Sequence, residues 1–389
     1  MPRLYDRNPS LNAPLVLIAT VFPVSLAHAV LISVLALRLE QAGIAPWLIG
    51  LNTAVFPLAT ILTGPLVPVL LRWVNPATLA VGGMAVAGAS AALMGFYSSL
   101  VAWFILRFAI GMGVTALWVV AEAWLNALAP EKGRGRIVAW YSVSLASGFA
   151  IGPQLVNLLG IDGILPFVVP AIVGFLTTMA LLFIREKAPV MAMTPAQGVG
   201  SLLKRAPIAL GLAAVSGSTE AAIFGLVPLF TVDIGLTKTG TLFFVSAFSV
   251  GSIILQPPLG WLIDHVSERR LTIILTLSAA ISAAVIPYFA GTVLLWPSIV
   301  FWGGVVYGFY TLGLTSLGRR FPATELASAN VVFVMAYQIG GTIGPPIVGA
   351  AMDQWGSSAL LFSLAAVAVA VPCINELITR IRHLQVKPN

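Results

Sequence analysis

Residues 148–156 read GFAIGPQLV, and residues 341–349 read GTIGPPIVG. Aligning the Ile-Gly-Pro that the two stretches share places Gly152 on Gly344, at an offset of 192 residues. This offset is close to half of the 389-residue chain. A glycine followed by proline within an apolar run is typical of closely packed, bent helices. The paired stretches therefore indicate that one such helix occurs once in each half of the chain.

A second pair of stretches supports the duplication. PLVPVLL at 65–71 and PLGWLID at 258–264 match at an offset of 193 residues. Weak matches that share an offset near half the chain length are typical of membrane proteins built from two repeats. We therefore expect an N-terminal bundle at 1–184, a cytoplasmic linker at 185–206 and a C-terminal bundle at 207–389.

The composition indicates an integral membrane protein. Hydrophobic residues make up 59% of the sequence and charged residues only 8%, against roughly 25% charged in soluble domains. The single cysteine, Cys373, permits neither an internal disulfide nor a thiolate metal cluster. The sequence has no phosphate-binding glycine loop and no paired His-Glu metal motif. We therefore expect no cofactor and no metal.

The apolar runs predict twelve membrane-spanning helices. Each run has about 20 residues or more, which is enough to cross the hydrocarbon core. Arg3 and Arg7 precede an Ala-x-Ala at 27–29, as in a signal peptide, but the run continues to about Leu37, which favours an uncleaved helix. The runs fall at about 14–39, 46–71, 77–97, 100–128, 137–160, 163–184, 207–232, 239–263, 271–290, 294–317, 326–352 and 357–379.

The basic residues predict the orientation. Seventeen of the 20 lysines and arginines fall in the two tails and in the loops on one side of the membrane. This asymmetry places both termini in the cytoplasm. It also accounts for the net charge of +7 without nucleic acid, because the basic groups face the anionic inner leaflet.

Several motifs resemble those of the major facilitator superfamily. GWLIDHVSERR at 260–270 is similar to the family's loop motif, whereas the loop after the second helix keeps only Arg72 of the basic pair. RFAIGMG at 107–113 is similar to the family's arginine-plus-glycine motif, and 118–126 with 133–141 resemble the bacterial YcaD-type branch. The resemblance implies an all-α membrane protein with twelve transmembrane helices in two pseudo-symmetric six-helix bundles.

Two ionisable residues lie near the middle of equivalent helices. His28 and Glu220 differ by 192 residues, which is the offset of the repeat. In the resembled family the first and seventh helices line the central cavity, so this pair is a candidate for coupling a proton to transport. The alternative is structural: His28 bonds to a neighbouring helix, and Glu220 bonds to a hydroxyl such as that of Ser216.

The fourth predicted helix carries two further charges. Arg107 and Glu122 share a face of this helix but are separated by about 22 Å along its axis. Arg107 suits an anionic group of the substrate or a structural ion pair. Glu122 lies near the cytoplasmic end, where it is a candidate gate residue that pairs with Arg134 or Arg136, or alternatively a proton site.

The resemblance adds residues to the cytoplasmic gate. In the family, the acid of the loop motif contacts the start of the fifth helix and holds the inner side shut. Asp264 occupies this position, and Arg269 and Arg270 form the basic pair. The alternative for Asp264 is a solvated loop charge.

Other residues are candidates by type and position. The substrate cavity is predicted to contain polar and aromatic side chains, although packing is the alternative for the aromatic ones: Trp118, Gln154, Gln256, Tyr307, Tyr310, Asn330, Tyr337 and Gln338. Small and bending residues in the fifth and eleventh helices are predicted to form surfaces on which the halves rock, or merely to pack: Gly148, Gly152, Pro153, Gly340, Gly344 and Pro345.

These features predict a secondary transporter rather than an enzyme. We expect alternating access, coupling to protons, and a small organic solute that is amphipathic or anionic. The Gly-Pro of the fifth helix is similar to a motif of the family's antiporters, which favours export; import and a non-transporting assembly or sensor protein are the alternatives. The expected partners are the solute, protons and the lipid bilayer. The protein is expected to be a monomer in the bacterial cytoplasmic (inner) membrane.

Overall fold

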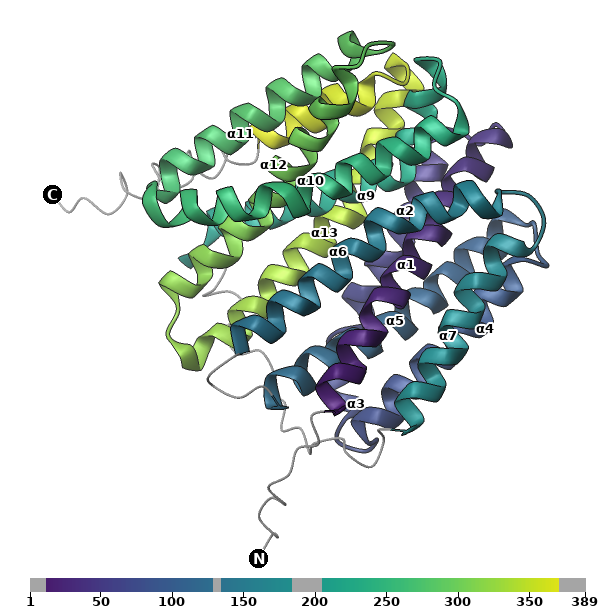
Figure 1. The fold of residues 1–389 in the computed structure, drawn as a ribbon, viewed down its shortest axis with the longest axis vertical. Helices are drawn as coiled ribbons and strands as arrows, with labels where there is room; N and C mark the ends of the chain where they lie inside the picture. Colours follow the sequence, from purple (N-terminus) through teal and green to yellow (C-terminus); the bar gives the residue numbers. More distant parts are fainter. Residues whose placement is uncertain (1–11, 129–133, 184–204, 371–389) are drawn as a thin grey trace, which may run out of the picture. The chain divides into compact units, whose positions relative to one another are not determined.

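The structure is a computed structural model that describes residues 12–128, 134–183 and 205–370. Every regular element in these ranges is a helix. Among the described residues, ten helices are long and apolar enough to cross a membrane, and two shorter apolar helices lie at Val143–Leu159 and Ala359–Ala370. The predicted all-α membrane fold is thereby confirmed (Figure 1).

The helices follow the predicted apolar runs, although the second run is interrupted before its end. In chain order they are α1 (Asn12–Gln41), α2 (Pro46–Thr63), α3 (Leu66–Leu70), α4 (Pro76–Met94), α5 (Leu100–Leu128), α6 (Arg134–Leu159), α7 (Leu165–Phe183), α9 (Pro207–Asp233), α10 (Lys238–His265), α11 (Glu268–Val285), the 3-10 helix η2 (Ile286–Phe289), α12 (Leu295–Arg320) and α13 (Ala323–Trp355).

Local chemistry explains several helix ends. The side chain of Asn75 accepts a hydrogen bond from the backbone N–H of Ala77 at 2.9 Å and caps α4, whose first residue is proline. The hydroxyl oxygen of Thr237 caps α10 in the same way, because it accepts a hydrogen bond from the backbone N–H of Gly240 at 3.2 Å. The turn between α1 and α2 contains Gly43 at a φ of 64°, a backbone conformation that residues other than glycine rarely adopt.

The chain divides into two compact units. Unit 1 comprises residues 1–31, 62–152 and 162–194, and unit 2 comprises residues 32–61, 153–161 and 195–389. The second unit therefore includes α2 and the adjoining ends of α1 and α6, which all precede the predicted linker. The linker at 185–206 lies outside the described residues up to position 204, and the predicted bundles stay a prediction.

In unit 1, small residues allow the helices to approach closely. A Cβ added at Gly83 of α4 would lie 2.7 Å from the carbonyl oxygen of Gly113 in α5. On α6, a Cβ at Gly148 would collide with Ser25 and Leu26 of α1. The predicted packing glycine of α6 thus lies where two backbones nearly touch.

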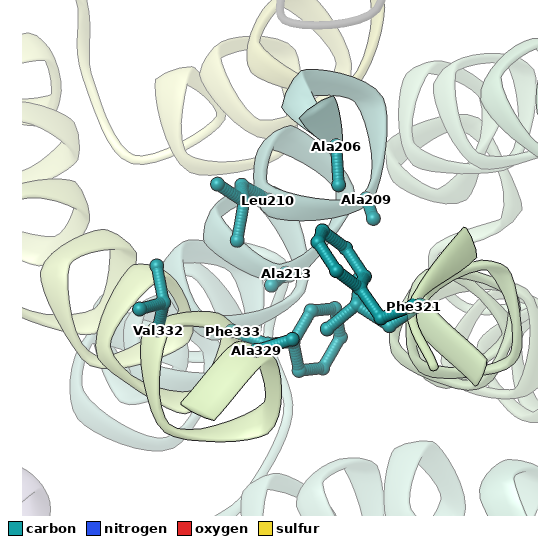
Figure 2. Close-up of a cluster of buried hydrophobic side chains, with 9 residues drawn as sticks. Ala206, Ala209, Leu210, Ala213, Phe321, Ala329, Val332 and Phe333 are labelled. Carbon is teal, nitrogen blue, oxygen red and sulfur yellow. The ribbon is translucent and has the colours of Figure 1, made fainter. Parts of the chain in front are cut away.

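In unit 2, α13 packs along α9 in the same manner. Cβ atoms added at Gly340 and Gly344 would collide with Ala214 and Ser218 of α9, respectively. Next to this contact, a cluster of buried apolar side chains joins α9, α12 and α13 (Figure 2). Its members are Ala206, Ala209, Leu210, Ala213, Leu317, Phe321, Ala329, Val332 and Phe333.

Helix α2 packs against both α9 and α13. A Cβ at Gly50 would collide with the carbonyl group of Pro345, which lies inside α13. At the start of α2, the backbone N–H of Trp47 donates a hydrogen bond to the carboxylate of Asp353 at 3.1 Å. This acid therefore stabilises the positive N-terminal end of α2. We call this contact between Trp47 and Asp353 the α2–α13 clasp.

The close approach of α9 and α13 predicts the effect of a small substitution. Gly340→Ala is expected to destabilise the fold by about 1–3 kcal/mol, because the added methyl group has no space and overpacking strains a close-packed interior. Gly318→Ala in α12 is the matched control, since a Cβ there meets nothing within 4 Å. Chemical unfolding of both variants in mixed micelles measures the difference, and equal stabilities would contradict the packing described for α9 and α13.

Candidate functional site

Glu220 lies near the middle of α9, a helix of 27 residues. Its carboxylate accepts side-chain hydrogen bonds from the hydroxyl groups of Tyr307 in α12 and Tyr337 in α13. Glu220 and both tyrosines are half-buried. Three helices of unit 2 thus converge on one carboxylate. The proton-coupling role of Glu220 and the place of the two tyrosines in a substrate cavity stay predictions.

Further side chains hold the two tyrosines in place. The hydroxyl group of Ser249 in α10 hydrogen-bonds to that of Tyr307, so a fourth helix joins the cluster. The ring of Tyr307 lies 5.7 Å from that of Phe248, and the ring of Tyr337 lies 5.5 Å from that of Tyr310 in a T-shaped arrangement. These contacts are of the kind that orient aromatic rings in protein interiors. We call Glu220, Ser249, Tyr307, Tyr310 and Tyr337 the carboxylate–tyrosine cluster.

The predicted amides of unit 2 occupy different environments. Gln256 accepts a hydrogen bond from Thr311 at 2.8 Å, which joins α10 to α12. The side-chain oxygen of Asn330 is buried and has no hydrogen-bond partner in the described part of the chain. Gln338 is buried. Asn330 therefore keeps an acceptor for a ligand or a water molecule on the same helix as Tyr337.

Gln154 forms a direct contact between two helices. Its amide donates hydrogen bonds to the carbonyl oxygen of Leu242 at 3.0 Å and to the hydroxyl group of Ser246 at 2.8 Å. Asn157 in turn donates to the side-chain oxygen of Gln154 at 2.9 Å. The amide therefore ties the end of α6 to α10 in unit 2. Its predicted role in the substrate cavity stays a prediction.

Unit 1 contains the other predicted site residues. The ring of His28 lies 5.7 Å from the ring of Phe149 and 6.5 Å from the ring of Trp118, in T-shaped arrangements. Arg107 is 4% exposed and interacts electrostatically with His28. The structure thus brings His28, Arg107 and Trp118 together. Because His28 belongs to unit 1 and Glu220 to unit 2, their coupling stays a prediction.

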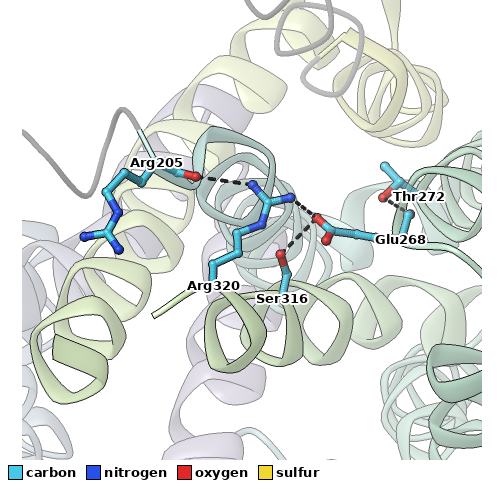
Figure 3. Close-up of polar contacts among 5 residues, drawn as sticks. All are labelled: Arg205, Glu268, Thr272, Ser316 and Arg320. Atoms are coloured by element: carbon cyan, nitrogen blue, oxygen red, sulfur yellow. Dashed lines mark hydrogen bonds and ion pairs between the residues drawn. The ribbon is translucent and has the colours of Figure 1, made fainter. Parts of the chain in front are cut away.

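A charged network ties together helix ends in unit 2. Arg320 at the end of α12 binds the carboxylate of Glu268 at 2.7 Å and the carbonyl oxygen of Arg205 at 3.2 Å. Ser316 donates a second hydrogen bond to Glu268 at 2.9 Å (Figure 3). Arg205 also pairs with Glu325 at the start of α13. The network therefore joins the ends of α9, α11, α12 and α13.

The predicted gate residues lie next to this network or outside the described side chains. Asp264 pairs with Arg319 at 3.5 Å, and Arg319 also binds the carbonyl oxygen of Ile263 at 2.9 Å. Arg269 and Arg270 are exposed at the start of α11. The side chains of Glu122, Arg134 and Arg136 lie outside the described part of the structure, so the gate stays a prediction.

Sequence reasoning did not select Glu268, Arg319 and Arg320 as site residues. Glu268 is part of the GWLIDHVSERR stretch, and the two arginines end the apolar run that contains Tyr307. The pattern of charges at helix ends predicts how the protein is oriented in the membrane. It does not specify which carboxylate pairs with which arginine.

The sequence comparison supplies the family. A family model described as the Major Facilitator Superfamily matches residues 17–311 and 209–384. The chain belongs to the major facilitator superfamily. The two matched ranges together span nearly the whole chain, so the resemblance inferred from the motifs is confirmed.

Relatives place this superfamily member among bacterial transporters. YfkF of Bacillus subtilis (strain 168), described as an uncharacterized MFS-type transporter, is 25% identical over 344 residues, which cover 86% of this chain and 88% of YfkF. YcaD of Salmonella dublin, described in the same terms, is 23% identical over 359 residues, which cover 88% of this chain and 90% of YcaD. The resemblance to the YcaD-type branch is therefore also confirmed.

Solved structures confirm the fold of this superfamily member. The structure of a D-xylose-proton symporter matches with a TM-score of 0.70 and 15% identity, and the match covers 92% of this chain and 97% of the symporter. At this identity the likeness concerns the fold alone. The protein is a multi-pass membrane transporter by family.

The charged network of this transporter allows a prediction about stability. The side chains of Arg320 and Glu268 are 35% and 24% exposed, so solvent weakens their attraction. A double-mutant cycle with Glu268→Gln and Arg320→Gln is expected to give a coupling free energy of about 1 kcal/mol. The measurement is chemical unfolding of the two single variants, the double variant and the parent protein. Additive effects of the two substitutions would contradict the pairing.

Proposed function

We propose that the protein is a proton-coupled secondary transporter that moves a small organic solute, amphipathic or anionic, by alternating access. The observation that carries this proposal is the carboxylate of Glu220 at the centre of α9, bonded to tyrosines of two other helices. A charged carboxylate is costly at membrane depth, and uptake of a proton removes that cost. Binding and release of the proton therefore change the energetics of the three converging helices.

The side chains around His28 in unit 1 support the proposed nature of the solute. Arg107 supplies a buried positive charge, and Trp118 and Phe149 supply aromatic surface beside His28. This combination suits an anionic or amphipathic solute. His28 and Glu220 are then the two proton-coupling groups, one from each repeat.

The proposal includes an orientation. The basic loop residues put both termini on the cytoplasmic side of the bacterial inner membrane. The charged network of Arg205, Glu268 and Arg320 then lies at the cytoplasmic ends of its helices, and the α2–α13 clasp lies at the outer ends. Asp264 and Arg319 belong to the inner gate in this arrangement.

The direction of transport has two candidates. The Gly-Pro of α6 favours export in exchange for protons, as in the family's antiporters. Uptake together with protons is the second candidate, the mode named in the description of the structurally similar D-xylose-proton symporter. Both directions use the same proton site.

Flux measurements with purified protein in proteoliposomes test the proposal. A panel of small organic solutes is screened by counterflow, and a trapped pH-sensitive dye reports proton movement. We expect saturable counterflow of at least one solute, with proton flux that depends on that solute. The sign of the proton flux relative to solute flux distinguishes export from import. No saturable flux of any solute would contradict the proposal and favour a non-transporting sensor or assembly role.

A further inference from the structure

The turn between α2 and α4, residues 64–75, presents large apolar side chains on its surface. Backbone hydrogen bonds continue the helical turn of α3 as far as Val74, whose N–H donates to the carbonyl oxygen of Leu70 at 2.9 Å. Residues three and four positions apart therefore lie on one face of this segment. Val67 is buried on the other side, and the exposed face consists of Leu66, Val69, Leu70 and Trp73. We call residues 64–75 the α2–α4 turn.

The depth of this turn in the membrane follows from the length of α4. This helix has 19 residues, so at about 1.5 Å per residue it spans nearly the whole hydrocarbon core of about 30 Å. Because α4 begins directly after the α2–α4 turn, the turn lies at one edge of the hydrocarbon core. Trp73, which is 76% exposed, lies at this edge, and tryptophan is enriched where the membrane meets water.

The matching stretch in the second half of the chain buries its apolar residues instead. At the offset of 193 residues, the positions that correspond to Leu66 and Leu70 are Leu259 and Ile263. The first two residues are 53% and 38% exposed, whereas the second two are 3% and 4% exposed. Helix α10 runs through its stretch without a break, but α2 and α3 are separate helices. Duplication of the fold therefore does not account for the apolar face of the α2–α4 turn.

The α2–α4 turn also differs from its counterpart in charge. Arg72 is the only charged residue between Glu40 and Arg107. It is exposed and directly precedes Trp73. The counterpart at 260–270 carries charges of both signs: Asp264, Glu268, Arg269 and Arg270. A single exposed arginine beside an apolar face suits the phosphate of a phospholipid, because no carboxylate in the turn competes for it.

We propose that the α2–α4 turn docks unit 1 onto the cytoplasmic leaflet of the membrane and binds the phosphate of an anionic phospholipid through Arg72. The exposed apolar face then enters the boundary between the headgroups and the acyl chains, as the apolar side of an interfacial helix does. Lipid is the partner because the face lies at the edge of the hydrocarbon core, where the bilayer surrounds the protein. The inference goes beyond the proposed transport function and uses only the orientation proposed with it.

Fluorescence quenching at the turn tests the docking. The full-length variant Leu70→Cys, in a Cys373→Ser background, carries a bimane label and is placed in nanodiscs. Lipids with a nitroxide near the headgroup end of an acyl chain quench the label from within the bilayer, whereas iodide quenches it from water. The matched control is Ser267→Cys, which is exposed in the turn between α10 and α11. We expect the ratio of lipid quenching to iodide quenching to be about threefold or more higher at position 70 than at position 267.

Headgroup selectivity tests the role of Arg72. Nitroxide-labelled phosphatidylglycerol and phosphatidylcholine are compared at the same mole fraction, with the bimane at position 70. We expect phosphatidylglycerol to associate about fivefold more strongly, the gain typical of one basic residue at an anionic surface. Arg72→Gln is expected to abolish this preference while phosphatidylcholine still quenches, which shows that the turn remains docked. Arg270→Gln removes an exposed arginine from the other turn and is expected to leave the preference unchanged.

Two outcomes contradict the docking, and two others contradict the lipid selectivity. Iodide quenching at position 70 as strong as at position 267, without lipid quenching, would place the turn in water. Protection from both quenchers would mean that protein covers the turn, either another segment of this chain or a second copy. Equal association of the two lipids, or a preference that persists in Arg72→Gln, would exclude Arg72 as the phosphate ligand. Quenching requires neither solute nor gradient, and both faces of a nanodisc are open, so failure of the proposed transport or orientation leaves this test intact.

Discussion

Accumulation driven by a pH gradient is expected to be lost when Glu220 is replaced by glutamine, while counterflow exchange of the same solute persists. Glutamine keeps the shape of the side chain and still accepts hydrogen bonds from the tyrosines that reach Glu220. It takes up no proton, so solute movement loses its link to the gradient. We expect accumulation to fall by about tenfold or more, because that coupling is the energy source. Uptake and counterflow in the same proteoliposomes measure the two activities.

Measuring both activities separates a loss of coupling from a loss of folding. A misfolded variant loses accumulation and counterflow alike, whereas a variant that only lacks proton coupling loses accumulation and keeps counterflow. Asp162→Asn is the control, because this acid is exposed between α6 and α7 and lies outside the cluster. If gradient-driven accumulation persists in Glu220→Gln, Glu220 is not the coupling group, and His28 is the remaining candidate for proton coupling.

Much of the fold follows from hydropathy alone. Apolar runs of membrane-crossing length predict the helices, because backbone groups in lipid must bond within their own segment. The 192-residue offset between Gly152 and Gly344 predicts two related halves. The interruption of the second run between α2 and α3 is not evident from hydropathy, since the residues at 64 and 65, Gly and Pro, lie within an otherwise apolar stretch.

The candidate site follows from the sequence in part. Glu220 stands out because a carboxylate is rare in such an apolar helix, and Tyr307 and Tyr337 stand out as polar aromatic residues. Their convergence on Glu220 depends on how α12 and α13 are rotated against α9. The close approach at Gly217 and Gly340 sets the contact between α9 and α13. A single sequence shows the residues, but it does not show the rotation of the helices.

Side chains whose partners lie far along the chain are the hardest to assign. Gln154 is predicted to lie in the substrate cavity, whereas in the structure its amide donates hydrogen bonds to α10, about 90 positions later in the chain. Asp353 lies in a segment whose charge suggests only an outer loop, whereas its carboxylate caps α2. In both residues a hydrogen bond between distant segments determines the structural role, and neither hydropathy nor spacing contains that information.

The α2–α13 clasp leads to the second large expected effect. Alternating access requires the outer ends of helices to separate during the transport cycle. Trp47 and Asp353 are joined by a hydrogen bond, and Gly50 packs tightly against Pro345 in the next turn of α2. If these ends separate during each cycle, a covalent bond between them stops transport.

Cysteines introduced at the two positions test this requirement. The chain has one native cysteine, Cys373, so Cys373→Ser provides a background without thiols. In this background, Trp47→Cys and Asp353→Cys are expected to form a disulfide on oxidation, because the Asp353 carboxylate already reaches the backbone of residue 47. Oxidation is expected to reduce both accumulation and counterflow by about tenfold or more, since neither proceeds without the conformational change.

Reversibility and single variants make the result specific. A reducing agent is expected to restore flux, which shows that the double variant is folded. Each single-cysteine variant is expected to transport equally before and after oxidation, because no bond forms between the helices. If the cross-linked protein, verified by its thiol content, transports at the rate of the reduced protein, α2 and α13 remain together throughout the cycle. The moving surfaces then lie elsewhere, and the Trp47–Asp353 hydrogen bond is a permanent structural contact.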